Sequence, residues 1–239
     1  MKIISKLKAK AENIHDFSQV TIAFLGDSVT QGCFDVYMQG ENSLETYFDA
    51  ENAYHTHLRK ILNMMFPKAP VNIINAGISG GTADRGVERL ERDVLQFSPD
   101  LCVVCFGLND SCTTDIETYK QAMAEIFDRL LEKNIEVIFM TPNMMCTEVS
   151  CHIAEPYIRQ VAENISHSQI NGTLEKFLSA AKEIAESRNI PVCDCYKKWK
   201  TLSDYGVNTT NLLANYINHP TPEMNWLFAY SLAETMFFN

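Results

Sequence analysis

The chain has 239 residues, which suits one domain with a sizeable core and would be crowded for two. Hydrophobic residues make up 46% and charged residues 21%, and the net charge of −10 argues against nucleic acid or an anionic membrane surface as a partner. No apolar stretch reaches the ~20 residues that a membrane span needs. We therefore expect one globular domain over residues 1–239, with no nucleic acid and no membrane among its partners.

The N-terminal segment is basic up to Lys10 but lacks the apolar core of a secretory signal, because Lys8, Lys10 and Glu12 interrupt it. An amphipathic helix with Ile3 and Leu7 facing inward fits the segment better. This favours a cytoplasmic location.

Eight cysteines raise the question of disulfides and metals. Without an export signal, and with Cys102, Cys105 and Cys193 inside apolar runs, we expect free buried thiols. Neither Cys193-x-Cys195 nor Cys151-His152 has the paired spacing of a zinc site.

The run from Val20 to Leu25 is rich in β-branched residues and predicts a buried strand. It leads into Gly26-Asp27-Ser28, so a serine hydroxyl stands at the carboxyl end of the strand, where open α/β sheets bind ligands. Ser28 is therefore a candidate nucleophile. Gly, Asp and Ser are also ordinary turn residues, and on this stretch alone Ser28 is equally interpreted as the cap of the following helix or turn.

Residues 33–52 are polar and aromatic without clear periodicity, which predicts a loop over the site. Its aromatic side chains either line the site or pack against one another. The spacing of apolar residues then predicts a helix from Tyr54 to Met65. His55 and His57 lie two apart on it, face different directions and are interpreted as surface residues.

A second strand, Val71–Asn75, ends in a glycine-rich turn over 76–82 whose backbone N–H groups suit negative charge. The turn does not have the GxGxxG pattern of a dinucleotide site. In the charged helix predicted over 85–97, Arg85, Arg89 and Arg92 are interpreted as a solvated face paired with acidic neighbours.

A third strand over 101–106 ends in Gly107-Leu108-Asn109-Asp110, again placing polar side chains after a glycine. The rest of the chain continues to alternate. Expected are a helix over 116–131, a strand over 135–140, an irregular pocket wall over 143–156, helices over 157–188 broken near Asn171-Gly172, a short edge strand over 190–194 and a last helix after 218–222.

Strands that alternate with helices predict a parallel sheet covered on both faces. We expect a three-layer α/β/α sandwich with a flavodoxin-like sheet of about five strands. Three strand ends with glycine and polar neighbours meet at one edge of such a sheet, and His219 stands just before the last helix. This convergence favours the nucleophile interpretation of Ser28.

Four short blocks, in order along the chain, resemble those of the SGNH hydrolases, also called the GDSL lipase/esterase family. Gly26-Asp27-Ser28 resembles the nucleophile block, with Val29 where the name-giving leucine would stand. The other three blocks are Asn75-Ala76-Gly77-Ile78-Ser79-Gly80, Gly107-Leu108-Asn109-Asp110 and His219-Pro220.

This resemblance implies roles for individual residues. Ser28 would attack an ester carbonyl, and His219 would act as general base and then as general acid. The oxyanion would be held by the backbone N–H groups of Ser28 and Gly80 and by the side-chain amide of Asn109. Asp27 and Asp110 would hold their turns. Neither a metal nor a nucleotide cofactor is implied.

The chain departs from the family three residues before the histidine, where Tyr216 replaces the usual aspartate. A neutral tyrosine does not stabilise an imidazolium as a carboxylate does. One explanation is a Ser–His dyad whose ring is oriented by a backbone carbonyl or by Asn218. Another is a carboxylate from elsewhere, such as Glu223 or Asp204, and a third is lost activity in a retained pocket. Because the nucleophile and oxyanion donors are intact, we favour the first two.

The expected activity is serine-dependent hydrolysis of a carboxylic ester, with a small-molecule or carbohydrate ester as substrate. No long apolar lid segment is present, which favours short acyl chains, acetyl above all, and aromatic residues in 33–52 suit stacking on a sugar. The alternatives are a catalytically weak binding module for an acylated or glycan ligand, and acyl transfer to an acceptor alcohol. The oligomeric state is left open.

Overall fold

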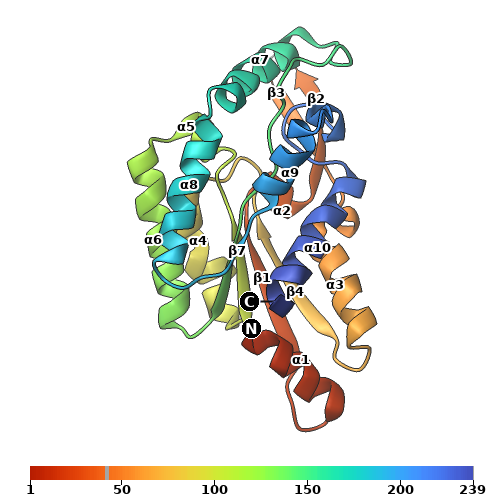
Figure 1. The fold of residues 1–239 in the computed structure, drawn as a ribbon, viewed down its shortest axis with the longest axis vertical. Coiled ribbons are helices and arrows are strands. Elements are labelled where there is room, and N and C mark those ends of the chain that lie inside the picture. Colours follow the sequence, from red (N-terminus) through yellow and green to blue (C-terminus); the bar gives the residue numbers. More distant parts are fainter. Residues whose placement is uncertain (41–42, 239) are drawn as a thin grey trace.

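The protein, a computed structural model that describes residues 1–40 and 43–238, is built around a parallel sheet (Figure 1). The strands of this sheet lie in the order β4-β1-β5-β6-β7, and all neighbouring pairs are parallel. They are β1 (Val20–Gly26), β4 (Val71–Gly77), β5 (Leu101–Cys105), β6 (Glu136–Met140) and β7 (Val192–Cys193). The order places β1 between β4 and β5, so the three glycine-bearing strand ends are neighbours.

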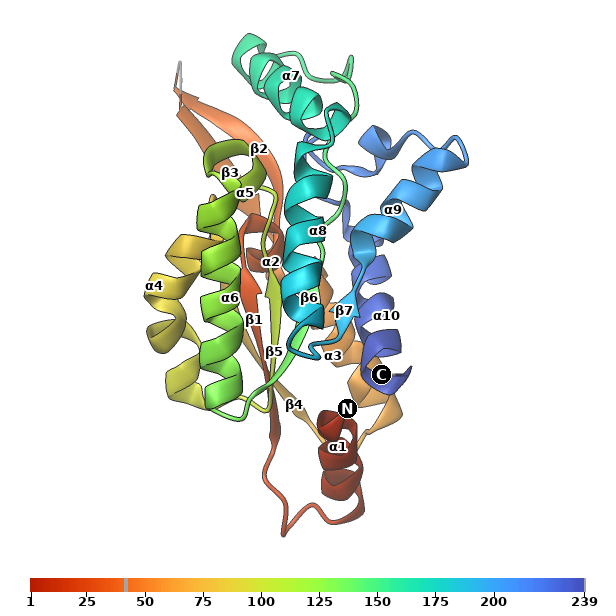
Figure 2. The same ribbon diagram turned by 60° about the vertical axis from the view of Figure 1, so that its left-hand side comes forward.

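Side chains of β1 alternate between two separate cores. Ile22 and Phe24 join the core beneath three helices, α1 (Lys2–Glu12), α3 (Tyr54–Met65) and α10 (Pro222–Phe238). Ala23 and Leu25 join the core beneath three others, α4 (Ala83–Asp93), α6 (Ile116–Glu132) and α8 (Thr173–Glu186). Figure 2 shows these two groups of helices on opposite faces of the sheet. The predicted three-layer sandwich with five parallel strands is confirmed. The long helices are α1 (Lys2–Glu12), α3 (Tyr54–Met65), α4 (Ala83–Asp93), α6 (Ile116–Glu132), α7 (Pro156–Ile170), α8 (Thr173–Glu186), α9 (Cys195–Asp204) and α10 (Pro222–Phe238).

Short elements connect the layers, and two of them carry site residues at strand ends. α2 begins at Ser28, and α5 follows Asn109. The break expected near Asn171-Gly172 separates α7 from α8, and β7 is a two-residue edge strand after Pro191, as predicted. The short elements are α2 (Ser28–Gln31), α5 (Asp110–Thr113), η1 (Ala50–Asn52), η2 (Leu95–Phe97) and η3 (Thr209–Leu212).

The segment expected to be a loop after Gly32 is instead an antiparallel hairpin. β2 (Cys33–Gly40) pairs with β3 (Ser43–Phe48). Val36 and Met38 pack against the core while Asp35 and Tyr37 are exposed, which is the two-residue alternation of a strand. The polar composition concealed this pattern, because only every second residue of a half-buried strand is apolar.

His55 and His57 are buried, so their interpretation as surface residues is wrong. α3 is covered both by the sheet and by α10, and the His57 ring stacks on Trp226 with centroids 4.0 Å apart. A helix covered from two sides buries a wider face than its apolar stripe alone indicates.

All eight cysteines are free thiols, and the three expected to be buried, Cys102, Cys105 and Cys193, are buried. Cys112 and Cys151 are exposed. Within residues 1–40 and 43–238, every helix is too short or too polar to span a bilayer.

Candidate active site

Ser28 and His219 meet across the carboxyl edge of the sheet. Ser28 Oγ lies 2.9 Å from His219 Nε2, and each residue has 4% of its surface exposed, although 191 positions separate them in the chain. Asp27, not Ser28, caps α2, because its carboxylate accepts a hydrogen bond from the Val29 N–H at 2.9 Å. The capping interpretation of Ser28 is therefore wrong, and the hydroxyl is directed at an imidazole.

The loop that carries His219 is held by its own backbone and by one amide side chain. The His219 carbonyl accepts the Ala214 N–H at 2.7 Å, and Leu213 and Pro220 form an isolated β-bridge. Asn215 Oδ1 accepts three backbone N–H groups, from Ile217, Asn218 and His219. These bonds set both the course of the loop and the orientation of the Asn215 amide.

The Nδ1 side of His219 faces an amide and a thiol, where the family usually supplies a carboxylate. Asn215 Nδ2 lies 3.1 Å and Cys33 Sγ 3.5 Å from His219 Nδ1. Asp204 and Glu223 are exposed, and among the described residues neither contacts the ring. The substitute-acid explanation is therefore wrong for both of these candidates.

The orienting role expected for Asn218 is also wrong as stated. Asn218 Oδ1 accepts a hydrogen bond from Asn215 Nδ2 at 3.0 Å, so Asn218 holds the residue that touches the ring rather than the ring itself. Tyr216 adopts a left-handed backbone conformation (φ +56°), and its ring stacks on His152. Burial alone lowers the pKa of His219 from its usual 6.5 to about 4.

The residues expected to form the oxyanion hole come from the three adjacent strand ends. Gly80 follows β4 at φ +71°, and a side chain there would project into open space. The Asn109 side-chain amide donates to the Gly81 carbonyl at 2.9 Å, which joins the turn after β5 to the turn after β4. Their role as oxyanion donors stays a prediction.

Asp110 joins the same two turns through its carboxylate. One oxygen accepts the Ala83 N–H at 2.8 Å, and the other accepts the Gly107 N–H at 2.9 Å. Asp110 thus holds the start of α4 against the end of β5, in line with its expected structural role. Burial raises the pKa of Asp110 to about 6, and burial with the nearby Asp110 charge raises that of Asp27 to about 7.

Arg89 is buried beneath the site, so its interpretation as a solvated ion-pair residue is wrong. Only 8% of its surface is exposed, and its guanidinium donates to the Gly26 carbonyl at 2.8 Å and to the Ala76 carbonyl at 2.6 Å. Asp93 pairs with it at 3.1 Å. Arg89 and Leu90 stand three and four residues after Gly86, so all three lie on one buried face of the helix. This spacing indicates burial, but we interpreted Arg89 from its charge alone.

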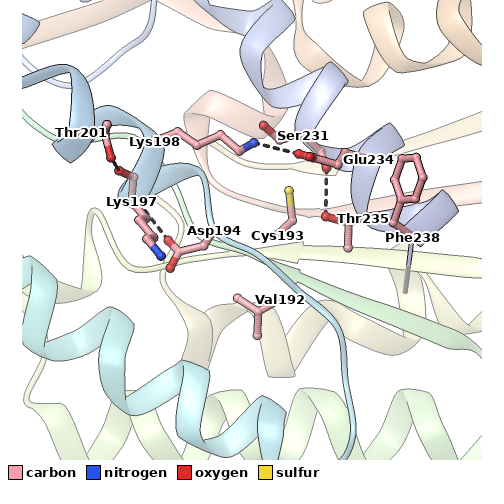
Figure 3. Close-up of a pocket in the computed structure, with 10 residues that line it drawn as sticks. All are labelled: Val192, Cys193, Asp194, Lys197, Lys198, Thr201, Ser231, Glu234, Thr235 and Phe238. Carbon is pink, nitrogen blue, oxygen red and sulfur yellow. Dashed lines mark hydrogen bonds and ion pairs between the residues drawn. The ribbon is translucent and has the colours of Figure 1, made fainter.

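Of two surface depressions, one is lined by a residue that contacts His219 and the other lies away from the predicted site residues. One of about 210 Å³ is lined by Asn215, whose amide contacts His219 Nδ1, and by Tyr216, His152 and the hairpin residues Asp35 and Val36. Another of about 510 Å³ lies between β7, α9 and α10 (Figure 3). It holds the Lys198–Glu234 ion pair and is lined by none of the predicted site residues.

Comparison with known proteins identifies the family. The GDSL-like Lipase/Acylhydrolase family matches residues 24–227, which span all four sequence blocks. The chain belongs to this family. Membership confirms the resemblance and, with it, the expected class of enzyme, a hydrolase of ester bonds.

Relatives of this GDSL-like hydrolase include acetylesterases. A segment of 89 residues is 30% identical to an acetylxylan esterase of Geobacillus stearothermophilus and covers 37% of this chain and 39% of that relative. The match thus spans about two fifths of the curated relative.

Solved structures share the fold at low sequence identity. A lipase/acylhydrolase from Enterococcus faecalis is 20% identical over 91% of this chain and 95% of its own, with a TM-score of 0.68. A catalytic mutant of an acetylxylan esterase from Geobacillus stearothermophilus is 18% identical over 93% and 96%, with a TM-score of 0.69. A two-domain esterase active on acetylated mannans is 20% identical over 98% of this chain and 52% of its own, with a TM-score of 0.68.

Sequence reasoning missed two residues of this GDSL-like hydrolase that touch the imidazole. Cys33 carried no motif, and nothing local indicates that the start of β2 passes behind His219. Asn215 stands four residues before His219, and its side chain accepts the backbone N–H groups of Ile217 and Asn218 as in an Asx turn. Asn is a residue type that favours such turns, and this is the signal that the sequence offered.

We expect Arg89→Met to destabilise the protein by about 2–4 kcal/mol, because the substitution removes a buried charged donor from the Gly26 and Ala76 carbonyls and leaves Asp93 without its buried partner. Urea unfolding measures the loss. The matched control is Arg92→Met on the same helix, since Arg92 also pairs with Asp93 but is exposed. The control should keep a midpoint close to that of the wild type. Equal effects of the two substitutions would contradict the role assigned to Arg89.

We expect Asp27→Asn to change how stability depends on pH. Because burial raises the pKa of Asp27 from 3.8 to about 7, its contribution to stability is fully present below pH 3.8 and is lost as pH rises through 7. Between pH 4.5 and pH 8, the unfolding free energy of the variant should therefore rise relative to that of the wild type by about 3 kcal/mol. A constant difference between variant and wild type would show that Asp27 is ionised throughout.

Proposed function

We propose that this protein is a serine esterase that hydrolyses carboxylic esters of short acyl chains, with O-acetyl groups on carbohydrates as the preferred class. The observation that carries the proposal is the buried contact of 2.9 Å between Ser28 Oγ and His219 Nε2. Membership of an ester-hydrolase family gives this pair its chemical context.

In the proposed acylation step, the proton of Ser28 passes to His219 Nε2 while Oγ attacks the ester carbonyl carbon. The electron pair of the carbonyl double bond moves to the oxygen, and the oxyanion is held by the N–H groups of Ser28 and Gly80 and by the Asn109 amide. When the carbonyl re-forms, the bond to the leaving oxygen breaks. The imidazolium then returns its proton to the departing alcohol.

Deacylation repeats these steps with water in place of Ser28. His219 takes a proton from the water, whose oxygen attacks the acyl carbon, and the imidazolium then protonates Ser28 Oγ as the acid leaves. A neutral imidazole is required at the start of both steps. Because burial lowers the pKa of His219 to about 4, the ring is neutral throughout the physiological range. The same shift makes it a weak base.

Two features support a carbohydrate acetyl ester as substrate. Named relatives include an acetylxylan esterase and an esterase active on acetylated mannans. The hairpin begins at Cys33, which contacts His219, and exposes Tyr37 and Tyr47 further along its strands. Tyr216 stacks on His152, and both residues line the depression that Asn215 also lines. Aromatic faces beside a polar centre suit sugar rings, which are apolar on one face and carry hydroxyl groups at the edge.

We expect activity on p-nitrophenyl esters to fall as the acyl chain lengthens from acetyl to dodecanoyl, and acetylated xylan to release acetate. Ser28→Ala should abolish turnover, and His219→Ala should lower kcat at least about 100-fold, because general-base catalysis is lost. Asn109→Ala should cost ~10²–10³ in kcat as an oxyanion donor disappears.

Ser231→Ala serves as the control for a serine substitution, since its hydroxyl donates to the Leu227 carbonyl within α10 and Ser231 lines the depression of Figure 3, away from the predicted site residues. Turnover of every ester no higher than in Ser28→Ala, together with no labelling of Ser28 by a fluorophosphonate, would overturn the esterase and favour the binding module. Acetylated sugar formed in the presence of an added sugar alcohol would instead favour acyl transfer.

The acid limb of kcat/KM should have its midpoint near pH 4–5, well below that of an ordinary histidine, because burial disfavours the imidazolium and, among the residues that the structure describes, no carboxylate contacts the ring. Initial rates with p-nitrophenyl acetate across pH measure this limb. Asp27→Asn is the control, since it removes any limb near pH 7 that the buried Asp27 carboxyl contributes. A midpoint near 6.5 that persists both in this control and in Asp110→Asn, which removes the other buried carboxyl with a raised pKa, would mean that a charged partner faces His219.

A further inference from the structure

The amide of Asn215 faces His219 with its donor side. Its Oδ1 accepts three backbone N–H groups, which leaves Nδ2 as the atom 3.1 Å from His219 Nδ1. An amide nitrogen donates hydrogen bonds and does not accept them. If Nδ1 carries a proton, Asn215 therefore offers that proton no acceptor.

Cys33 supplies the second contact to the same nitrogen. Its sulfur lies 3.5 Å from His219 Nδ1, and only 2% of the residue is exposed. The thiol also lies 3.5 Å from the Asp35 carbonyl, to which it can donate its own proton. Burial and the Asp35 charge raise the pKa of Cys33 to about 12, so the thiol stays protonated and its sulfur keeps lone pairs for Nδ1.

One turn of chain places Ser28 and Cys33 on two sides of the imidazole. α2 starts at Ser28 and ends at Gln31, and the left-handed conformation of its C-cap Gly32 (φ +96°) turns the chain into β2 at Cys33. The Gly32 carbonyl accepts the Asp49 N–H at 2.8 Å, which ties the turn to the end of β3 at the base of the hairpin, where Cys33 pairs with Phe48. The nucleophile and the thiol are thus positioned by the same backbone.

The two neighbours of Nδ1 favour opposite placements of the imidazole proton. If Asn215 donates to Nδ1, the proton sits on Nε2, which then donates to Ser28 Oγ and cannot accept the serine proton. If Nδ1–H points to the Cys33 sulfur, Nε2 is free to act as the base. In serine proteases, an amide in place of the triad carboxylate enforces the wrong tautomer and lowers kcat about 10⁴-fold.

We propose that Cys33 is a positioning residue for His219: its sulfur accepts the Nδ1–H and keeps Nε2 free to take the proton of Ser28, against the opposing Asn215 amide. The proposal rests on the proposed esterase function for its kinetic consequence. Its structural part, the tautomer of His219, stands independently of any substrate.

The first test reads the tautomer directly. In ¹⁵N-histidine-labelled protein at pH 7, with His219→Ala used to assign the signal, the nitrogen shifts should show the proton of His219 mainly on Nδ1. Cys33→Ala should move it mainly to Nε2, while Cys102→Ala should leave it in place, because Cys102 is a buried thiol of the core beneath α4, α6 and α8. A proton that resides on Nε2 in the wild type, or a tautomer unchanged by Cys33→Ala, overturns the proposal.

The second test is kinetic. Cys33→Ala should lower kcat on p-nitrophenyl acetate about 10-fold with little change in KM, a smaller loss than that of the base itself because a thiol sulfur is a weak acceptor. Asn215→Asp, which replaces the donor by an acceptor at the same position, should raise kcat and make Cys33 dispensable. In that background, Cys33→Ala should change kcat less than about 2-fold.

Additive effects of the two substitutions on kcat would overturn the proposal, since a merely structural thiol would cost as much in either background. Failure of the esterase function itself is recognised separately. In that case Ser28→Ala would match the wild type on all esters, and the tautomer measurement would still decide whether Cys33 positions His219.

Discussion

The candidate site depends on holding the carboxyl ends of β1, β4 and β5 together. A parallel sheet brings these ends to one edge but leaves their last carbonyls and the N–H groups of the following turns without sheet partners. Arg89 donates to the ends of β1 and β4, and Asp110 accepts from the turns after β4 and β5. Two buried charged groups therefore tie three turns, and the small groups proposed to act on substrate are attached to those turns.

Burial in this arrangement raises the pKa values of two carboxyl groups. Asp27 and Asp110 are surrounded by backbone donors, which favour the charged form, yet burial raises the pKa of both above 3.8. Desolvation therefore outweighs hydrogen bonding at these positions. Arg89 lies close enough to Asp27 for their charges to interact, but its own contacts are with strand-end carbonyls and Asp93. The buried polar groups hold the geometry of the site, and their desolvation lowers the stability of the fold.

Within residues 1–40 and 43–238, the contacts of the His219 ring are with a hydroxyl, a thiol and an amide rather than with a carboxylate. A triad aspartate stabilises the imidazolium and fixes the tautomer at once. In this chain the two tasks separate, because the thiol and amide near Nδ1 influence the tautomer but carry no charge. Burial then lowers the pKa of the ring unopposed. A centre of this kind keeps its histidine neutral over a wide pH range and gains less electrostatic help in the transition state.

The sequence by itself determined the layered architecture and predicted that blocks far apart in the chain meet at one edge of the sheet. Hydrophobic runs ending at glycine located β1, β4 and β5, and the four ordered blocks indicated the family before any geometry was known. Local patterns suffice here, because the alternation of strands and helices and the turn chemistry at strand ends are encoded within short windows.

Only the tertiary structure decided which polar residues are buried and what touches His219. The burial of Arg89, His55 and His57, the hairpin at 33–48 and the approach of Cys33 to Nδ1 all depend on segments far apart in the chain. Periodicity reports which face of an element is apolar, but not which other element covers its remaining faces. Contacts made across 186 positions, such as Cys33 with His219, arise only when the chain has folded back on itself.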